Sequence, residues 1–479
     1  MVELPGATKL RIDLKVLPAR GALRVLAAYL LWPNLVFWLI GTRIYLMRPV
    51  LNLDYLLLGA LAVLLPRRLA IAMVAAEVAV DALLNVAPAF HFELGRFLLE
   101  LVDVVHLNPL QVVSGAIALI ACSTAVAVVG SKLAGQSLGK SQFVGLIALG
   151  VVLAGVDAMN GTSLISRGVT RSFLSFNLAN SAAAKTALAL YRETRDSGPG
   201  RYAPLTPADS AAGPWLAEAR DASTKLRNHN LALISVESLG LPTDSKAALA
   251  LLAPLMGPEL RAKYTVEQGS VPFHGVTMDG EFRELCGVRL EQRGRDVPTC
   301  LPALLHARGY ETFGLHGFTS QFYDRASWYP KLGFDHVLFA QELRARGLSR
   351  TCGSGFVGLC DGDVAEVAGE TLRGATPGKP RLVYWMTLNS HLPLSNGDAE
   401  GSSFDCASGS SFAGDDVLCE QARVVSKALQ AVAKVALDPA LPPTEFVVVG
   451  DHAPPFLSRE RRDAYDQQRV PFVRLVPRR

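Results

Sequence analysis

Apolar residues are concentrated in the first third of the chain, in runs long enough to cross a membrane. Each run has roughly the 17–25 residues that a helix needs to span a hydrocarbon core of about 30 Å. From residue 190 onward, apolar and polar residues are mixed as in a water-soluble domain. The pattern predicts an α-helical transmembrane bundle of about five spans, at residues 22–41, 50–66, 69–88, 111–131 and 142–160.

The 479-residue chain is therefore expected to have two structural units joined by a linker. We assign residues 1–160 to the transmembrane anchor, 161–205 to a juxtamembrane linker and 206–479 to a globular domain. The linker alternates apolar and basic residues at roughly helical spacing. Two interpretations stay open for it: an amphipathic helix on the membrane surface, or a solvated linker helix.

The globular domain shows strand patterns that alternate with helical patterns. Near-continuous apolar runs at 231–240, 381–391 and 444–455 are typical of strands buried on both faces, and residues 297–309 and 417–437 have helical patterns. This alternation predicts a mostly parallel central sheet covered by helices. In such sheets, ligands bind beyond the carboxyl ends of the strands.

The distribution of Lys and Arg predicts the orientation of the anchor. Basic residues occur in the first 20 residues and in the loops after spans two and four, whereas the loop after span three is mainly acidic. The positive-inside rule places the N-terminus in the cytoplasm, and an odd number of spans places the globular domain outside. Arg43 and Arg48, in the first outer loop, count against this orientation. The net charge of +4 is small and the basic residues are scattered, so nucleic acid is not an expected partner.

Six of the seven cysteines lie in the globular domain, and the seventh, Cys122, lies in the fourth span. An even set of cysteines in a domain outside the membrane favours disulfides. Zinc binding through thiolates is the alternative, although the sequence contains no Cys-x-x-Cys motif. The short separations favour three local pairs: Cys286 with Cys300, Cys352 with Cys360, and Cys406 with Cys419.

Residues with metal-binding side chains follow the predicted strands. Glu237 follows the first strand, and Asp451 and His452 follow the third. Two carboxylates and an imidazole suit Zn²⁺, Mn²⁺ or Mg²⁺, and three ligands with an open position are typical of a catalytic site. The alternative is that each is a helix cap or a surface residue. Gly-Asp-His directly after an apolar strand argues against that alternative.

Several short motifs occur in a particular order over residues 230–475: VESLG, GVTMDGEF, HG with FYDR and YPKLGFD, LNSHLPL and VVVGDHAPP. In this order they resemble the membrane-anchored sulfatase-like transferases of the alkaline phosphatase superfamily, which include lipoteichoic acid synthases and lipid A phosphoethanolamine transferases. The resemblance implies a sulfatase-like α/β domain after the transmembrane bundle. It also implies one divalent metal, Zn or Mn, with Mg as a further option.

The resemblance assigns roles to individual residues. It implies a metal shell of four residues: Glu237, Thr277, Asp451 and His452. Thr277 would also be the nucleophile, and His391 would contact the transferred phosphate. His316 and Arg325 would line the pocket for the acceptor or the headgroup. The structural alternative for His391 is a turn histidine.

These residue types suit phosphoryl transfer. A threonine hydroxyl is a poor nucleophile at its own pKa, and a divalent cation favours its deprotonated form. An arginine fork can bind phosphate oxygens in a bidentate manner. A surface ion pair with Asp324 or Asp335 is the structural alternative for Arg325. Asp361 and Asp363 resemble a metal loop, but a disulfide-bounded turn and helix start is the preferred interpretation.

The implied function is a two-step transfer at the outer, periplasmic face of a bacterial inner membrane. A phospholipid, phosphatidylethanolamine or phosphatidylglycerol, would donate its headgroup phosphate to Thr277. A hydroxyl of an envelope glycan or of lipid A would then accept it. TMDGEF is similar to the phosphoglycerol branch and the cysteines are similar to the phosphoethanolamine branch, so the sequence leaves the headgroup open.

Two alternatives differ in chemistry. One is a sulfatase or phosphodiesterase hydrolase, but sulfatases use a Cys-x-Pro-x-Arg motif, and CGVRL at 286–290 lacks the proline and has its arginine one position early. The other is a non-catalytic subunit of envelope polysaccharide assembly that retains the fold. The presence of all four metal-shell residues argues against it.

Overall fold

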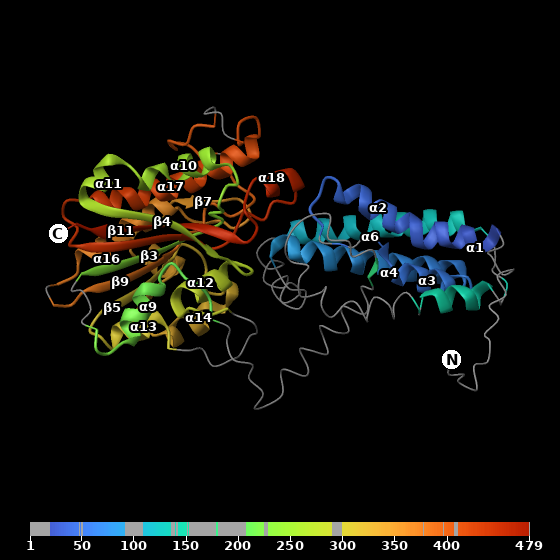
Figure 1. Ribbon diagram of the computed structural model, residues 1–479, viewed down its shortest axis with the longest axis horizontal. Helices are drawn as coiled ribbons and strands as arrows, with labels where there is room; N and C mark the ends of the chain where they lie inside the picture. Colours follow the sequence, from blue (N-terminus) through green and yellow to red (C-terminus); the bar gives the residue numbers. More distant parts are fainter. Residues whose placement is uncertain are drawn as a thin grey trace, which may run out of the picture. The chain divides into compact units, whose positions relative to one another are not determined.

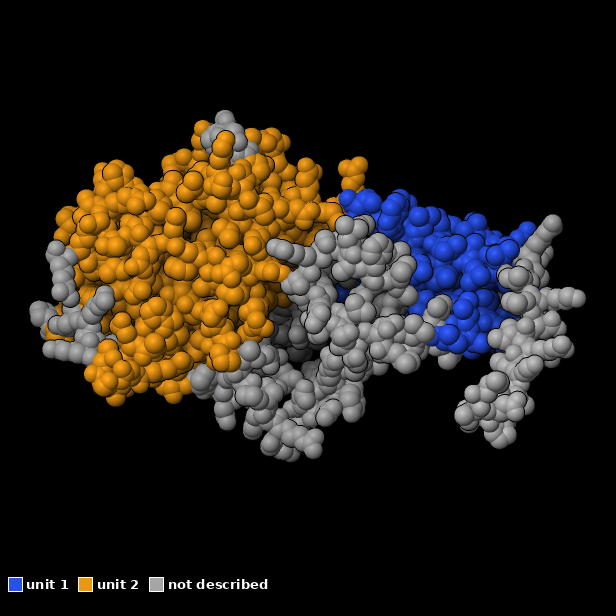
Figure 2. All heavy atoms as spheres, in the orientation of Figure 1, with its two compact units in different colours: residues 1–42, 46–86, 110–198 blue, residues 43–45, 87–109, 199–479 orange. Residues whose placement is uncertain are grey.

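The computed structural model divides the chain into two compact units (Figure 2). It describes residues 20–46, 48, 51–91, 109–135, 139, 142–150, 152, 179–180, 207–224, 229–289, 299–376, 378–395, 397–406 and 411–478. Unit 1 comprises residues 1–42, 46–86 and 110–198, and unit 2 comprises 43–45, 87–109 and 199–479. Two short segments from the first quarter of the chain, 43–45 and 87–109, therefore group with the C-terminal domain.

Unit 1 is helical. Three of its described helices are long and apolar enough to cross a membrane: Gly21–Gly41, Arg67–Val86 and Val112–Ala134. They agree in position with the helices predicted at 22–41, 69–88 and 111–131. Its described elements are α1 (Arg20–Val25), η1 (Leu26–Leu31), α2 (Trp32–Gly41), β1 (Leu51–Asn52), α3 (Asp54–Ala62), α4 (Arg67–Val86), α6 (Pro109–Ala134) and β2 (Ala179–Asn180).

The count of five spans is not confirmed. In place of the span predicted at 50–66, the structure has α3, a helix of nine residues. At 1.5 Å per residue it is about 13.5 Å long, less than half the thickness of a hydrocarbon core. Residues 142–150 of the fifth predicted span are helical, and most of its remainder lies outside the described residues. Apart from residues 179–180, the predicted linker up to 205 also lies outside them.

Unit 2 contains a seven-stranded sheet in the order β4-β11-β10-β3-β9-β5-β6 (Figure 1). The pairs from β10 to β6 are parallel, and β11 is antiparallel to both of its neighbours. The predicted mostly parallel sheet is confirmed. The strands are β3 (Asn230–Val236), β4 (Tyr264–Pro272), β5 (Glu311–His316), β6 (His336–Leu338), β9 (Arg381–Met386), β10 (Thr444–Gly450) and β11 (Arg469–Pro477), with a separate pair β7 (Thr351–Cys352) and β8 (Gly358–Leu359).

The two central strands explain why the sheet forms. Every residue of β3 (NLALISV) and β10 (TEFVVVG) is buried, as expected for strands covered on both faces. Their register pairs Thr444 with Asn230 and Gly450 with Val236. The two strands therefore end at the same level, and the residues that follow them start side by side.

Helices cover both faces of the sheet, with α10, α11 and α17 on one side and α9, α12 and α13 on the other (Figure 1). The predicted helices at 297–309 and 417–437 correspond to α13 and α17. The bounds are α9 (Gly213–Arg220), α10 (Ser245–Leu252), η3 (Ala253–Leu255), α11 (Pro258–Lys263), α12 (Thr277–Cys286), α13 (Leu301–His306), η4 (Phe322–Asp324), α14 (Arg325–Trp328), η5 (Pro330–Leu332), α15 (Ala340–Ala345), α16 (Asp361–Arg373), α17 (Asp416–Leu437) and α18 (Arg459–Asp463); η2 (Ala87–Phe90) is a further 3-10 turn.

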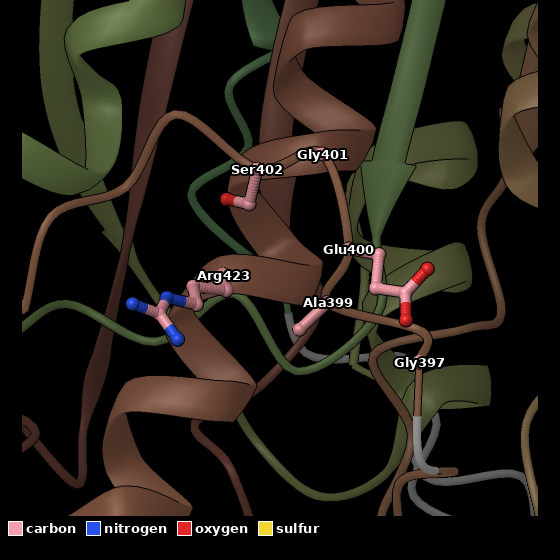
Figure 3. Close-up of a pocket in the computed structure, with 6 residues that line it drawn as sticks. All are labelled: Gly397, Ala399, Glu400, Gly401, Ser402 and Arg423. Carbon is pink, nitrogen blue, oxygen red and sulfur yellow. The ribbon is translucent and has the colours of Figure 1, made fainter.

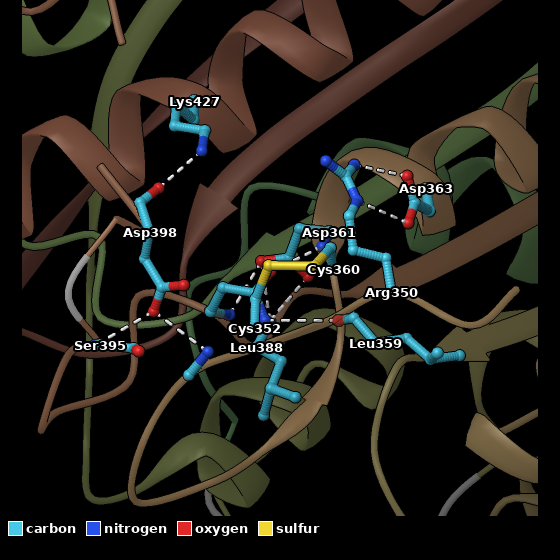
Figure 4. The surroundings of a disulfide bond; sticks show 12 residues. Arg350, Cys352, Leu359, Cys360, Asp361, Asp363, Leu388, Ser395, Asp398 and Lys427 are labelled. Atoms are coloured by element: carbon cyan, nitrogen blue, oxygen red, sulfur yellow. Dashed lines mark hydrogen bonds and ion pairs between the residues drawn. A yellow bond between two sulfur atoms is a disulfide. The ribbon is translucent and has the colours of Figure 1, made fainter. Parts of the chain in front are cut away.

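All three predicted disulfides are present, which excludes the thiolate zinc site. Cys352–Cys360 closes the turn that precedes α16 (Figure 4). Asp361 and Asp363 then form the first turn of that helix, as the disulfide-bounded turn predicts. Asp363 pairs with Arg350 at the surface.

Candidate metal and nucleophile site

Two neighbouring strands bring three side chains that could bind a metal to one point. Glu237 directly follows β3, and Asp451 and His452 directly follow β10. Because Gly450 pairs with Val236, the two strands place these three residues together. One ligand atom from each lies within 4.8 Å of the others, and all three residues are buried. The cluster that the strand ends predict is therefore present in the fold.

Thr277 completes this cluster as the first residue of α12. Its hydroxyl donates a hydrogen bond to Glu237 Oε2 at 3.1 Å and lies 3.4 Å from His452 Nε2. The Asp279 carboxylate accepts a hydrogen bond from Val276 N at 3.0 Å, which closes the first turn of the helix. Gly275 has a φ of +106°, where a side chain would be strained and would collide with Asp279. The turn thus holds Thr277 at a helix N-terminus, a position that favours a bound phosphate.

The donor atoms of the cluster fit a divalent cation. Asp451 Oδ1 accepts hydrogen bonds from two backbone N–H groups, those of Ser238 and His452. Among the described residues, Asp451 Oδ2 is buried and accepts no hydrogen bond. His452 Nδ1 lies 2.9 Å from the Ala453 carbonyl and must donate to it, which leaves a lone pair on Nε2. His452 Nε2 lies 3.4 Å from Asp451 Oδ2 and 3.5 Å from Glu237 Oε1. Carboxylate oxygens and an imidazole nitrogen that converge on one buried point match the preferences of Zn²⁺ and Mn²⁺.

The charges of the cluster are consistent with a cation. Burial, together with the adjacent Glu237 carboxylate, raises the pKa of Asp451. Burial lowers the pKa of His452, but the carboxylates of Asp451 and Glu237 outweigh it and raise that pKa overall. Both directions express the cost of buried negative charge without a full counter-charge. A divalent cation would remove this cost.

The backbone around Glu237 is held in an unusual conformation. Ser238 has a φ of +53°, in the left-handed region that residues other than glycine rarely adopt. Its hydroxyl donates to Glu237 Oε1 at 2.8 Å, and its carbonyl accepts from Gln421 Nε2 at 2.9 Å. Local strain of this kind is common at functional sites, where surrounding contacts maintain it.

The structure brings two further predicted histidines to the ends of neighbouring strands. His316 ends β5 and is buried, and His391 follows β9 and is partly buried. Their Nδ1 atoms donate to the carbonyls of Met386 and Leu392, at 3.0 and 2.7 Å. Burial lowers the pKa of His391 to about 4, and burial with the Arg325 guanidinium lowers that of His316 well below its usual value. Both rings are therefore neutral, with a lone pair on Nε2. Their roles in binding phosphate or the acceptor stay predictions.

Arg325 is not part of the candidate metal cluster of Glu237, Asp451 and His452. It is buried at the start of α14 and pairs with Glu281, with Nη2 and Nε at 3.0 and 3.1 Å from Glu281 Oε2. Glu281 also accepts hydrogen bonds from the hydroxyls of Tyr329 and Tyr384. Neither Asp324 nor Asp335 is its ion-pair partner among the described residues. Since Glu281 belongs to α12, Arg325 braces the helix that begins with Thr277, and its role in a substrate pocket stays a prediction.

Glu281 lies within the TMDGEF motif, and this position suggests that it braces the loop of Thr277; its ion pair with Arg325 agrees with such a role. Sequence reasoning did not identify the contact that Asp361 makes. Asp361 accepts backbone hydrogen bonds from Leu388 and Asn389, at 3.0 and 2.8 Å, and so holds the loop that carries His391. Its contact with this loop joins residues far apart in the sequence, which no local pattern reveals.

The structure also contains a pocket of about 320 Å³ away from these residues (Figure 3). Its lining includes the Arg423 guanidinium, which donates to the Phe404 carbonyl at 3.4 Å. None of the predicted site residues lines it. The lining residues are Gly397, Ala399, Glu400, Gly401, Ser402 and Arg423.

Comparison with known proteins agrees with the motifs. The sulfatase family model matches residues 261–479, and no curated protein matches the chain. Three solved structures are similar to it. The lipoteichoic acid synthase LtaP from Listeria monocytogenes has 16% identity and a TM-score of 0.39, over 55% of this chain and 71% of that one. The phosphoglycerol transferase GacH from Streptococcus pyogenes, in complex with sn-glycerol-1-phosphate, has 16% identity and a TM-score of 0.34, over 56% of this chain and 78% of that one.

The third is the C-terminal periplasmic domain of EcEptC from Escherichia coli in complex with Zn, with 13% identity and a TM-score of 0.36, over 57% of this chain and 77% of that one. The family match contains Thr277, Asp451 and His452, whereas Glu237 lies before its first residue, 261. The part of this chain that contains Thr277, Asp451 and His452 is therefore similar to the sulfatase family.

Proposed function

We propose that this protein is a metal-dependent transferase that moves a phospholipid headgroup phosphate onto a hydroxyl of an envelope glycan or lipid A. The headgroup is phosphoethanolamine or phosphoglycerol. The observation that carries the proposal is the hydrogen bond of 3.1 Å between the Thr277 hydroxyl and Glu237, inside a cluster of two carboxylates and an imidazole. A hydroxyl in this setting is suited to attack phosphorus.

Four residues would hold the metal, which we propose to be Zn²⁺ or Mn²⁺, with Mg²⁺ as a further option: Glu237, Thr277, Asp451 and His452. When bound, the cation would lower the pKa of the threonine hydroxyl and neutralise negative charge on the phosphoryl group. The N-terminus of α12 would add the partial positive charge of its free N–H groups on the same side.

In the first step, Thr277 Oγ1 forms a bond to the donor phosphorus, and the bond from phosphorus to the diacylglycerol oxygen breaks. The hydroxyl proton leaves toward Glu237 Oε2, which already accepts its hydrogen bond. The diacylglycerol oxygen takes up a proton as it departs. The headgroup phosphate remains on Thr277 as a phosphodiester.

In the second step, the acceptor hydroxyl attacks the same phosphorus and the bond to Thr277 breaks. The proton of the acceptor passes to a base, and Thr277 regains its own proton. His391 is suited to be that base because its Nδ1 donates to the Leu392 carbonyl and its Nε2 is free to accept.

The anchor and the disulfides support the proposed location. The three apolar helices are long enough to hold the chain in the membrane that contains a phospholipid donor. Three disulfides in unit 2 are typical of an oxidising compartment such as the periplasm. We therefore place the transferase at the periplasmic face of a bacterial inner membrane.

Intact-mass analysis of the purified full chain tests the proposal. The chain is incubated with phosphatidylethanolamine or with phosphatidylglycerol. We expect one of the two to add a single headgroup phosphate that maps to Thr277 and is missing in Thr277→Ala and after chelation of metal. Absence of an adduct with both lipids, with Thr277→Ala cells retaining a normal envelope, would instead support the non-catalytic assembly subunit. An adduct that is released by water but not by an acceptor hydroxyl would support a hydrolase.

A further inference from the structure

Unit 2 includes two short segments from the first quarter of the chain, and a short stretch after the metal-binding residues binds the first of them. Ile44 forms an antiparallel bridge with Ser458. Tyr45 N donates to the Leu457 carbonyl at 2.7 Å, and Arg459 N donates to the Arg43 carbonyl at 3.1 Å. Residues 43–45 are therefore bound by backbone hydrogen bonds to the stretch that begins five residues after His452.

Arg462 of α18 contacts both segments. Its guanidinium lies 4.2 Å from the centroid of the Tyr45 ring and donates a hydrogen bond to the Ala89 carbonyl. A second guanidinium nitrogen, Nη2, lies 3.4 Å from His91 Nδ1. The side chain of Arg462 is buried. One arginine thus holds residues 43–45 and 89–91 against the same part of the sulfatase-like domain.

His91 reaches the immediate surroundings of a metal-binding residue. Its Nε2 lies 3.1 Å from the Ala453 carbonyl, the same oxygen that accepts from His452 Nδ1 at 2.9 Å. The centroids of the His91 and His452 rings are 5.4 Å apart, and the rings of Phe273 and His91 pack in a T-shaped arrangement with a centroid distance of 5.2 Å. His91 has a φ of +64°, a rare conformation that these contacts maintain.

The hydrogen-bond partners determine the tautomer of His91. A guanidinium can only donate, so Nδ1 of His91 accepts, and a carbonyl can only accept, so Nε2 carries the proton. The Ala453 carbonyl therefore receives two N–H donors, one from each histidine. Two donors fix the direction of that carbonyl more firmly than one. Because His452 Nδ1 donates to this carbonyl, the direction of the carbonyl fixes the plane of the His452 ring. The ring plane in turn fixes the direction of the Nε2 lone pair.

We propose that His91 is a positioning residue for the metal site, acting through the Ala453 carbonyl on His452. The proposal rests on the metal binding that the proposed function requires. Groups that orient metal-binding histidines through the other ring nitrogen commonly change metal affinity by about 10–100-fold when they are removed. A residue that directly follows η2, between α4 and α6 in the sequence, thus determines how well the sulfatase-like domain binds its metal.

The test measures Zn²⁺ affinity of the full chain by competition with a chromophoric chelator. His91→Phe keeps a ring of similar size against Phe273 and removes the donor to Ala453. We expect it to weaken Zn²⁺ binding by about 10–100-fold and to change the visible absorption of bound Co²⁺, with little change in the thermal midpoint of the metal-free protein. His91→Gln retains an N–H donor, and we expect it to restore affinity to within a few-fold of the unmodified chain.

A matched control is His306→Ala, because His306 has a side chain that is 61% exposed and pairs only with surface Asp335 among the described residues. This variant should bind Zn²⁺ like the unmodified chain. Unchanged Zn²⁺ affinity and an unchanged Co²⁺ spectrum in His91→Phe would overturn the proposal. If Glu237→Gln binds Zn²⁺ as well as the unmodified chain does, the proposed metal site itself is overturned. Failure of the proposed metal site can thus be distinguished from failure of the proposed role of His91.

Discussion

Gly280 of α12 packs directly against Asp451 of the candidate metal cluster. A Cβ atom on Gly280 would lie 2.9 Å from Asp451 Cβ and 3.0 Å from its Cα. No side chain fits in this space without moving the aspartate, so the glycine determines how closely α12 approaches the end of β10.

We predict that Gly280→Ala displaces Asp451 and weakens Zn²⁺ binding and transfer. Overpacking at a buried contact costs about 1–3 kcal/mol. A displacement near 1 Å in a catalytic group can reduce the rate by about 100-fold. Zn²⁺ competition and adduct formation at Thr277 measure the two effects. Gly213→Ala is the control, because a Cβ there meets nothing within 4 Å; equal behaviour of the two variants would contradict the prediction.

The buried pair between Arg325 and Glu281 predicts a large loss of stability when one partner is removed. Arg325→Met leaves the Glu281 carboxylate uncompensated, which costs about 3–5 kcal/mol. For a domain of this size we expect the thermal midpoint to fall by roughly 10 °C. Arg350→Ala removes an exposed ion pair with Asp363 (Figure 4) and should cost less than about 1 kcal/mol.

The same variant distinguishes two roles of Arg325. If Arg325→Met keeps its thermal midpoint but binds the phospholipid donor poorly, the arginine is a phosphate ligand, as the resemblance to transferases implies. If the midpoint falls and Glu281→Gln with Arg325→Met costs less than the sum of the single changes, the two residues form one structural unit.

The disulfides predict the number of reactive thiols. Three bridges and the free Cys122 should give one alkylated cysteine per denatured chain before reduction and seven after it. Replacing Cys286 and Cys300 by serine opens a loop with a sequence separation of 14 and should cost about 3 kcal/mol. Three or more reactive thiols before reduction would show that a bridge is absent.

Asp361 predicts a pH dependence of stability. Burial raises the pKa of Asp361 to about 7, although the N–H groups of Asn389 and Leu388 oppose this effect. The unfolded chain has the ordinary value near 3.9, so the folded state binds more protons between these two values. The contribution of Asp361 to stability is therefore fully present below about pH 4 and is lost as the pH rises through about 7.

The free energy of unfolding measured against Asp361→Asn, with a chelator present, isolates this contribution because asparagine does not titrate. We expect the difference between the two proteins to fall with a slope of up to about 1.4 kcal/mol per pH unit in this window. A difference that is constant from pH 4 to pH 7 would show that Asp361 titrates normally.

The sequence predicted those parts of the site that a strand end determines. Glu237, Asp451 and His452 follow apolar strands, and parallel neighbours must bring their carboxyl ends together, so adjacency follows from the pattern. The surroundings of Arg325 could not be predicted in this way. It lies in a cluster of Glu281 and aromatic hydroxyls, which belong to other elements. His91 gave no signal, since its contact with Ala453 joins residues 362 positions apart.

The predicted spans show a similar limit. Apolar composition at 50–66 indicates burial but does not distinguish lipid from protein as the surroundings. In the structure, Tyr55, Leu56 and Ala60 of α3 are buried against other residues of unit 1. A short helix that is apolar for reasons of packing therefore has the composition of a span.

The three histidines at the strand ends all donate from Nδ1 to a main-chain carbonyl, those of Met386, Leu392 and Ala453. Every residue type has such a carbonyl, so replacement of those three side chains leaves the acceptors in place. The proton positions of the site are therefore encoded in the path of the backbone. Homologues can diverge around these histidines and still keep the three Nε2 lone pairs in the same positions.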